Sequence, residues 1–271
     1  MKNIVKKILR RLGLLRVTFR LSEAIKVVNV RTWYRNAQYS DKAVQDRLAI
    51  PPSKLIVLVA GTADISWYLE SGKLAAQSIL HTLEKHKLAI DHFQAILDFG
   101  CGCGRVIRHW NSLKKVKVYG TDQDPKLIKW CRLNLPFAQC ETNDLYPPLS
   151  YSDGRFDFIY ALSVFTHMPE PLQFLWINEL SRVLRPGGYL LITTHGQRFL
   201  EELNPNEQEE YEAGRLVVRN EEAVGTNLCT ACHPLSYVRE KLAKGFDMID
   251  FIPGGAKGNP HQDVFLLRKP V

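Results

Sequence analysis

From residue 94 onwards, short apolar segments rich in β-branched and aromatic residues alternate with segments whose apolar residues recur at helical spacing. The strand-like segments are 95–99, 116–121, 137–141, 156–162 and 189–194. Helical patterns stand between them at 105–113, 125–135 and 172–184. Strands that alternate with helices form βαβ units, in which the strands are parallel and the helices cover the sheet. This pattern predicts an α/β fold with a doubly wound sheet.

The end of the chain departs from this alternation. A helix-like segment at 235–246 leads to an apolar segment at 247–252, and a turn that contains Pro253, Gly254 and Gly255 separates it from a last apolar segment at 262–269. A turn rich in Pro and Gly favours a reversal of the chain. We therefore expect a seven-stranded, Rossmann-like sheet that is mostly parallel and has an antiparallel last strand.

The sequence before the first strand predicts two further parts. Residues 46–92 have helical patterns and are expected to form a helical cap over the carboxyl edge of the sheet, while residues 93–271 form the main domain. Residues 1–45 form a basic arm. The net charge of the chain is +8, and residues 1–35 alone contribute about +9, from ten Lys and Arg residues against Glu23.

The arm is amphipathic, because its apolar residues at 4, 8, 12 and 15 share one face of a helical wheel. Two interpretations remain open: the arm lies on an anionic membrane surface, or it packs on its own domain or on the partner in a dimer. Arg10 and Arg11 interrupt the apolar stretch, which argues against a secretory signal and a membrane span. We expect a cytoplasmic protein, or one that is peripheral at the inner membrane surface.

An acidic insertion separates the strand-like segment at 189–194 from the helix-like segment at 235–246. Residues 197–228 contain eight glutamates against three arginines. The insertion is either a solvated loop or a lid beside the substrate, since loops at the carboxyl edge of such sheets line the ligand crevice.

The first strand ends in a glycine-rich loop with an acid at its start. The spacing is Asp98-x-Gly100-x-Gly102-x-Gly104, which differs from the dinucleotide pattern G-x-G-x-x-G and from the P-loop. A carboxylate at this point repels a pyrophosphate and favours a cationic ligand. Glycines without a Cβ atom allow a bulky ligand to lie against the backbone.

This loop resembles motif I of the class I S-adenosylmethionine-dependent methyltransferases. Four further segments follow in the order of that family: VYGTDQDP, TNDLYPPL, FDFIYALSVFTHM and LSRVLRPGGYLLITT. The resemblance covers about residues 94–270. It implies that S-adenosylmethionine is the cofactor, that Asp122 accepts the ribose hydroxyls and that Asp144 lies near the adenine amino group. The full set of cofactor-binding residues that it implies is Asp98, Phe99, Gly100, Cys101, Gly102, Gly104, Asp122, Gln123, Asp144, Leu145 and Ser163.

Methyl transfer from a sulfonium needs alignment above all, but an acceptor hydroxyl must also lose its proton to a base within reach. His167 follows the fourth strand-like segment, whose loop borders the methyl group in related folds, and is the first candidate. His195, at the end of the fifth segment, is the second. The alternative role for His167 is structural, either at the start of the next helix or as a packing residue.

The six cysteines show no disulfide framework, so we interpret them as reduced thiols. The string CTACH at 229–233 matches the attachment pattern of c-type haem, but no export signal accompanies it. Cys229, Cys232 and His233 also lack a fourth zinc ligand at finger spacing. Cys101 and Cys103 lack partners in the sequence, so we predict no metal site.

These observations favour a methyltransferase that acts on a small molecule or a saccharide, at oxygen or nitrogen, and the wording SVFTHMPE resembles a bacterial subgroup of this kind. Two alternatives remain: an NAD(P)-dependent oxidoreductase, and a non-catalytic module with the same fold. We expect no nucleic-acid partner, because the charge outside the arm is slightly negative and the acidic insertion repels phosphates.

Overall fold

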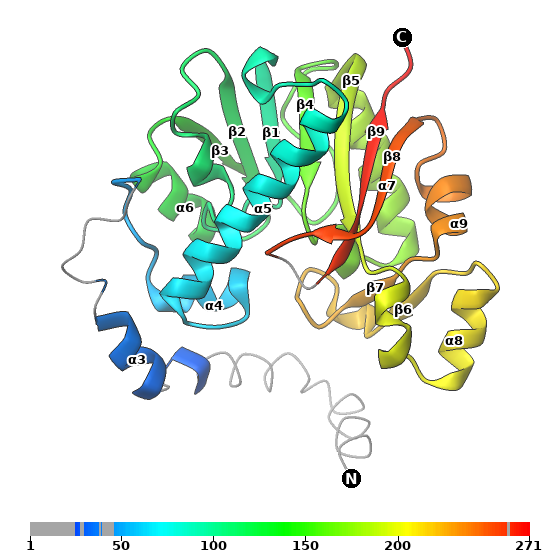
Figure 1. Ribbon diagram of the computed structural model, residues 1–271, viewed down its shortest axis with the longest axis horizontal. Coiled ribbons are helices and arrows are strands. Elements are labelled where there is room, and N and C mark those ends of the chain that lie inside the picture. The colour runs from blue at the N-terminus through cyan, green and yellow to red at the C-terminus, as the bar shows by residue number, and fades with distance from the viewer. Residues whose placement is uncertain (1–24, 28–29, 38, 40–45, 259–260) are drawn as a thin grey trace. The chain divides into compact units, whose positions relative to one another are not determined.

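The computed structural model describes residues 25–27, 30–37, 39, 46–258 and 261–271 (Figure 1). The chain divides into two compact units, residues 1–69 and residues 70–271. Most of the predicted arm, including its apolar face, lies outside the described residues, and the predicted domain limits at residues 45 and 92 stay predictions.

Among the described residues of the first unit lie the short helices α3 (Val30–Ala37) and α4 (Ser53–Ala60), and the first residues of α5. Helix α4 ends at Gly61, whose φ of 68° is the left-handed conformation that terminates helices. The Asn36 side chain joins α3 to the segment that follows α4. Its Nδ2 donates to the Ala63 carbonyl at 2.7 Å, and its Oδ1 accepts from the Ile65 amide at 3.1 Å. These bonds satisfy backbone groups that have no helical partner.

The second unit is built on a seven-stranded sheet with the order β3-β2-β1-β4-β5-β9-β8. Strand β9 is antiparallel to both of its neighbours, β5 and β8, and the other paired strands are parallel. The predicted fold class, including the antiparallel last strand, is confirmed. The strands are β1 (Ala95–Phe99), β2 (Lys117–Asp122), β3 (Ala138–Thr142), β4 (Phe156–Ala161), β5 (Leu184–Thr194), β8 (Asp247–Ala256) and β9 (Gln262–Arg268).

Helices cover both faces of this sheet, as Figure 1 shows for α5 and α7. Leu190 and Ile192 of β5 belong to a core that includes Trp176 of α7. Leu191 and Thr193, which alternate with them, point to the other face, where residues 75–79 of α5 lie. The helices are α5 (Ile65–Lys85), α6 (Pro125–Asn134), α7 (Glu170–Val183) and α9 (Leu235–Tyr237), which continues as a π-helical segment, Val238–Leu242.

One predicted helix is wrong. The sequence at 105–113 has helical spacing, but the structure contains turns and a short 3₁₀ helix, Ile107–Trp110. Its side chains are largely buried on several sides, since Arg108 and Trp110 are 1% and 2% exposed. The helical spacing of the apolar residues therefore reflects burial on several sides, and the segment is not an amphipathic α-helix.

The acidic insertion has secondary structure of its own. Helix α8 (Pro205–Glu212) begins with a capping box, in which Asn204 and Glu207 exchange side-chain and backbone hydrogen bonds. Strands β6 (Val217–Arg219) and β7 (Thr230–Cys232) pair in antiparallel fashion. A small core formed by Leu203, Tyr211, Val217 and Cys232 holds the insertion together. The insertion is thus a folded subdomain rather than a solvated loop.

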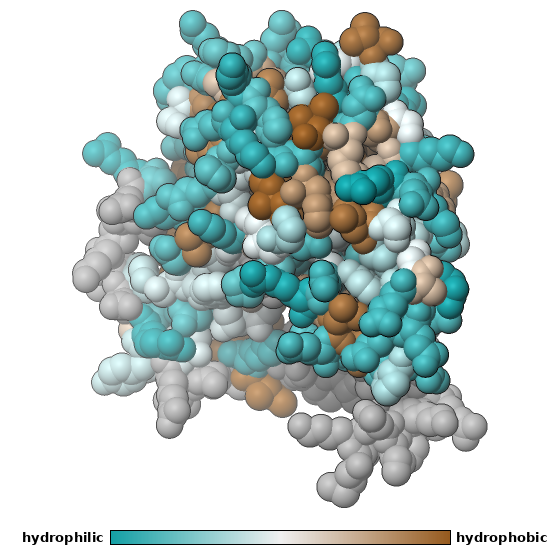
Figure 2. Space-filling model, turned by 45° about the vertical axis from the view of Figure 1, so that its right-hand side comes forward, coloured by the Kyte–Doolittle hydropathy of each residue, from teal (hydrophilic) through white to brown (hydrophobic). Residues whose placement is uncertain are grey.

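On the face shown in Figure 2, hydrophilic side chains predominate and apolar side chains form smaller groups between them. In the described part of the chain, no helix combines the length and the apolar character that crossing a bilayer requires.

Candidate active site

The predicted cofactor residues meet where parallel strands β1 and β2 end. Asp98 is the penultimate residue of β1 and Asp122 is the last residue of β2, and the loop with Gly100, Gly102 and Gly104 connects to both. The Gly100 and Cys101 amides donate to the Thr121 carbonyl at 2.8 and 2.9 Å. The loop is therefore anchored to the neighbouring strand, and its position is fixed before any ligand binds.

Close packing explains why two positions of this loop have no side chain. A Cβ atom on Gly100 would lie 2.4 Å from Cγ2 of Val164, and one on Gly104 would lie 2.3 Å from Cδ1 of Leu135. Both glycines have positive φ, 83° and 79°, which side-chain-bearing residues adopt at a cost. The glycines thus serve backbone conformation and packing, as well as the close approach of a ligand.

Asp98 is a buried carboxyl group that lacks full compensation. It is 4% exposed, and its Oδ2 atom has no hydrogen-bond partner among the described residues. Burial raises the pKa of Asp98 to about 8, although a hydrogen bond from Tyr160 and the charge of Arg105 act in the opposite direction. A buried acceptor with an unused oxygen favours a cationic ligand, as the sequence predicted.

Asp122 joins the end of β2 to the glycine loop. Its Oδ2 accepts from the Gly102 amide at 2.9 Å, and its Oδ1 accepts from the Asp124 amide at 2.9 Å. Burial raises the pKa of Asp122 to about 6, and these backbone donors limit the rise. A carboxylate oxygen has more than one lone pair, so both oxygens can still accept bonds from a pair of ribose hydroxyls.

The insertion reaches the residue that follows Asp122. Gln123 donates from Nε2 to the Gly225 carbonyl at 2.7 Å, and a Cβ atom on Gly225 would lie 3.4 Å from Leu145. Gln123 and Leu145, both predicted to bind the cofactor, therefore face the insertion from two strand ends. Asp144 precedes Leu145 and is exposed. This contact supports the interpretation of the insertion as a lid.

Two of the residues predicted to bind the cofactor, Phe99 and Cys101, have side chains that point into the core. The Phe99 ring packs against Trp176, with 4.6 Å between ring centroids. The Cys101 sulfur lies below the loop and donates to the Gly102 carbonyl at 3.7 Å. What Phe99 and Cys101 offer to a ligand at the strand edge is therefore backbone surface.

Ser163 belongs to a polar network that the sequence did not indicate. Its amide donates to Thr193 Oγ1 at 2.8 Å, and its hydroxyl accepts from Gln262 Nε2 at 2.8 Å. Gln262 is fully buried, accepts from Thr193 at 2.7 Å and lies 3.2 Å from His195 Nε2. Residues 163, 193, 195 and 262 come from separate loops and strands, so no local pattern marks them as a group.

The hydrogen bond of His167 defines its tautomer. His167 Nδ1 lies 2.7 Å from the Cys229 carbonyl, which only accepts, so Nδ1 carries the proton and Nε2 keeps its lone pair. Burial lowers the pKa of His167, so the ring is neutral at pH 7. Helix α7 begins at Glu170 with no side-chain cap, so the alternative role of His167 as a helix cap does not apply.

His195 is in a different state. The Gln262 amide group faces its Nε2 atom, and the Phe199 ring covers it with 3.8 Å between ring centroids. Burial, together with the nearby His167, lowers the pKa of His195 to about 3. Its ring centroid is 6.3 Å from that of His167. A ring that is this weakly basic and already engaged at Nε2 is a poorer proton acceptor than His167.

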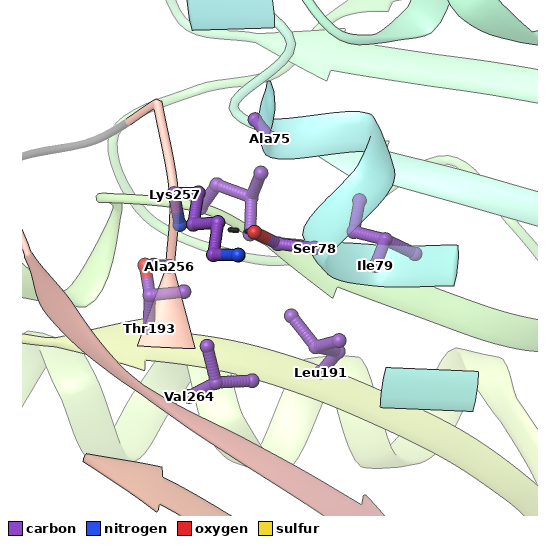
Figure 3. A pocket seen from close by; sticks show the side chains of 9 residues that line it. Ala75, Ser78, Ile79, Leu191, Thr193, Ala256, Lys257 and Val264 are labelled. Carbon is purple, nitrogen blue, oxygen red and sulfur yellow. Dashed lines mark hydrogen bonds between the residues drawn. The ribbon is translucent and has the colours of Figure 1, made fainter. Parts of the chain in front are cut away.

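An apolar hollow adjoins this network (Figure 3). It is small and partly open to solvent, with a cavity volume of about 10 Å³, and one side is formed by Ala75, Ser78 and Ile79 of α5. Figure 3 shows Leu191, Thr193 and Val264 below these residues, with Lys257 at one side. Thr193 belongs to both the hollow and the polar network, so the two are contiguous.

The residues of the CTACH string do not gather as a ligand set. His233 Nε2 lies 3.1 Å from the Gln173 side-chain oxygen, the Cys229 carbonyl contacts His167, and Cys232 belongs to the core of the insertion. The one group of three potential metal ligands among the described residues lies elsewhere, at Cys101, Cys131 and Cys140.

Comparison with known proteins agrees with this geometry. Residues 97–192 match the family model described as a methyltransferase domain. The chain is 32% identical over 106 residues to 2-methyl-6-phytyl-1,4-hydroquinone methyltransferase of Synechocystis sp. and 30% identical over 118 residues to the mitochondrial ubiquinone biosynthesis O-methyltransferase of Dictyostelium discoideum. These matches cover 38% and 39% of this chain, and 32% and 36% of the relatives.

A solved S-adenosylmethionine-dependent methyltransferase from Methanosarcina mazei has the same fold, with a TM-score of 0.52 and 22% identity over 69% of this chain and 97% of that structure. The chain spans only about a third to about half of the length of the curated relatives that it matches, up to 54%. The residues that match the family model, 97–192, hold the glycine loop and most of strands β1 to β5.

Proposed function

We propose that this protein binds S-adenosylmethionine at the β1 and β2 ends and methylates a hydroxyl group of a small, largely apolar molecule. The match of residues 97–192 to a methyltransferase domain supports this proposal. The observation that carries the proposal is the arrangement of the two buried acids. Asp98 offers an uncompensated oxygen to a cation, and Asp122 offers a fixed carboxylate to a diol, on either side of one glycine loop.

S-adenosylmethionine supplies an electrophilic methyl group on a positively charged sulfur. The protein has to bind it, align the acceptor and exclude water. Asp98 balances positive charge of the ligand, while Asp122 and the backbone near Gly102 orient the ribose. In this proposal, the insertion at Gly225 packs on Gln123 and Leu145 beyond the ribose end of the cofactor site and limits the access of water there.

His167 is the proposed general base. Its proton is held on Nδ1 by the Cys229 carbonyl, so Nε2 is the basic atom. The ring accepts the hydroxyl proton as the oxygen bonds to the methyl group, and the imidazolium that forms keeps its bond to the Cys229 carbonyl. A base in this position typically accelerates such a step about 10²–10⁴-fold.

The side chains beside the polar network favour an apolar acceptor over a saccharide. The small hollow there is lined mainly by Ala, Leu, Ile and Val side chains, with polar groups at Ser78, Thr193 and Lys257. A saccharide needs many hydrogen-bond partners when it leaves water, whereas an aromatic or isoprenoid molecule with one hydroxyl needs few. The names of the two relatives, a hydroquinone and a ubiquinone-pathway methyltransferase, fit the same acceptor class.

The oxidoreductase alternative is less well supported. A dinucleotide would bring its pyrophosphate towards the loop that starts at Asp98, and burial of a second acidic group beside this carboxyl is unfavourable. Thermal shift measurements with S-adenosylhomocysteine and with NAD(P)H separate the two. We expect stabilisation by the former alone, and stabilisation by NAD(P)H alone would contradict the proposal.

The base is tested on His167→Ala, with a prenylated hydroquinone and a simple hexose as acceptors. We expect turnover of the hydroquinone to fall at least 100-fold while the affinity for S-adenosylmethionine stays within threefold. His195→Asn, which alters the neighbouring buried ring, is the matched variant and should retain more activity than His167→Ala. Equal losses in the two variants, or preferred turnover of the hexose, would overturn the assignment of base or acceptor respectively.

A further inference from the structure

Three buried cysteines from separate segments meet below the glycine loop. Cys101 lies in the loop itself, Cys131 on α6 and Cys140 on β3. Their sulfur atoms all lie within 4.8 Å of one another, and the residues are 4%, 0% and 4% exposed. The proposed methyl transfer uses none of the three thiol groups, so the cluster needs a separate explanation.

The spacing of the sulfur atoms fits one shared ion. A triangle whose sides are no longer than 4.8 Å has a point that is at most 4.8/√3, about 2.8 Å, from every corner. Metal–thiolate bonds are about 2.3 Å long. Each sulfur therefore has to move inward by at most about 0.5 Å, which a small side-chain rotation provides.

The surroundings select the kind of ion. The described residues add no fourth His, Cys or carboxylate ligand to this group, and the Gly102 carbonyl lies 3.4 Å from the Cys131 sulfur. Structural Zn²⁺ sites are almost always four-coordinate, and a buried site has no ready supply of water for the open position. Soft Cu⁺ binds thiolates and is satisfied by three of them.

Positive charge stands next to the cluster. Arg132, one residue after Cys131, donates from Nε to the carbonyl of Cys140 at 2.7 Å. Its guanidinium group offsets part of the negative charge that three thiolates would retain around a monovalent ion. The three sulfurs are held by a helix, a strand and an anchored loop, so the site is largely preformed.

We propose that Cys101, Cys131 and Cys140 form a binding site for a single Cu⁺ ion. Each cysteine that binds as a thiolate releases its proton to solvent, and no electron is transferred. The site does not rest on the proposed methyl transfer, since its three ligands are present whatever the acceptor is. Because Cys101 follows Gly100 in the loop, an ion bound here sits directly below the cofactor-binding backbone.

The test is an anaerobic titration of the reduced full chain with Cu⁺ supplied from a competing chelator. We expect one tightly bound ion per chain, and at least a 100-fold loss of affinity in both Cys131→Ala and Cys140→Ala. Cys232→Ala is the matched control, because Cys232 is equally buried, at 3% exposed, but lies outside the cluster; it should bind Cu⁺ like the wild type.

Binding of S-adenosylhomocysteine and the circular dichroism spectrum report whether each variant is folded. If one of Cys131→Ala and Cys140→Ala does not fold, the other still tests the site. A wild-type chain that binds no stoichiometric Cu⁺, or cluster variants that bind it as well as Cys232→Ala does, would overturn the site. Tighter binding of Zn²⁺ than of Cu⁺ to the same cysteines would overturn the choice of ion.

Discussion

Replacing Asp98 with Asn should stabilise the ligand-free protein at alkaline pH while weakening cofactor binding. Burial raises the pKa of Asp98 from 3.8 to about 8. Between pH 5 and pH 8 the unfolded state has lost this proton while most of the folded state keeps it. The folded state therefore binds more protons, and the stability of the wild type falls as the pH rises through this interval. Asn carries no charge and removes this dependence.

The magnitude follows from the two pKa values. The contribution of Asp98 changes by about 3 to 4 kcal/mol between pH 5 and pH 8. Urea unfolding of the wild type and Asp98→Asn at several pH values measures the difference, and the two curves should diverge by this amount. Asp144→Asn, at an exposed position, is the control and should follow the wild type. Curves for Asp98→Asn and the wild type that stay parallel from pH 5 to pH 8 would refute the reasoning.

The same charge links Asp98 to the cofactor. With a pKa of about 8, most of the Asp98 groups hold a proton at pH 7, and a cationic ligand should displace it. Calorimetric titration with S-adenosylmethionine in two buffers of different ionisation enthalpy should show release of nearly one proton per bound ligand. Asp98→Asn should bind at least tenfold more weakly and release none. Equal proton release by both proteins would show that another group titrates.

Four further changes test other parts of the site. Asp122→Ala should weaken cofactor binding at least tenfold in calorimetry, because a buried carboxylate acceptor typically contributes about 2–5 kcal/mol, and unchanged affinity would contradict the ribose assignment. Gly100→Ala should lower the melting temperature and the cofactor affinity together, since its Cβ atom meets Val164 at 2.4 Å at a φ of 83°; a variant as stable as the wild type would show that the loop can shift. Gln123→Ala should raise hydrogen exchange in residues 220–228, because it removes the bond to Gly225, and exchange that stays at the wild-type level would argue against a hinged lid. Deleting residues 1–20 should leave cofactor affinity near the wild-type value and reduce binding to anionic liposomes or change the oligomer size, and a loss of cofactor affinity would place the arm in the site.

The sequence determined the fold with good accuracy where the signals are local. Apolar β-rich segments placed all seven strands of the large sheet, and β1 was predicted at its observed limits, 95–99. The positions of Asp98 and Asp122 at strand ends followed directly, because the apolar segments also indicate where each strand ends. The helix predicted at 105–113 failed because burial on several sides imitates helical spacing.

Only the tertiary structure decided how distant residues act together. Gln262 and Ser163 are 99 positions apart, and the Cys229 carbonyl fixes the tautomer of a histidine 62 positions away. No local sequence pattern links Cys101 with Cys131 and Cys140; pairing of β2 with β3 and packing of α6 bring the three thiols within 4.8 Å. Periodicity indicates which face of an element is buried, but only the packed chain specifies which side chains meet there. Those contacts in turn determine the protonation states and the possible ligand sets.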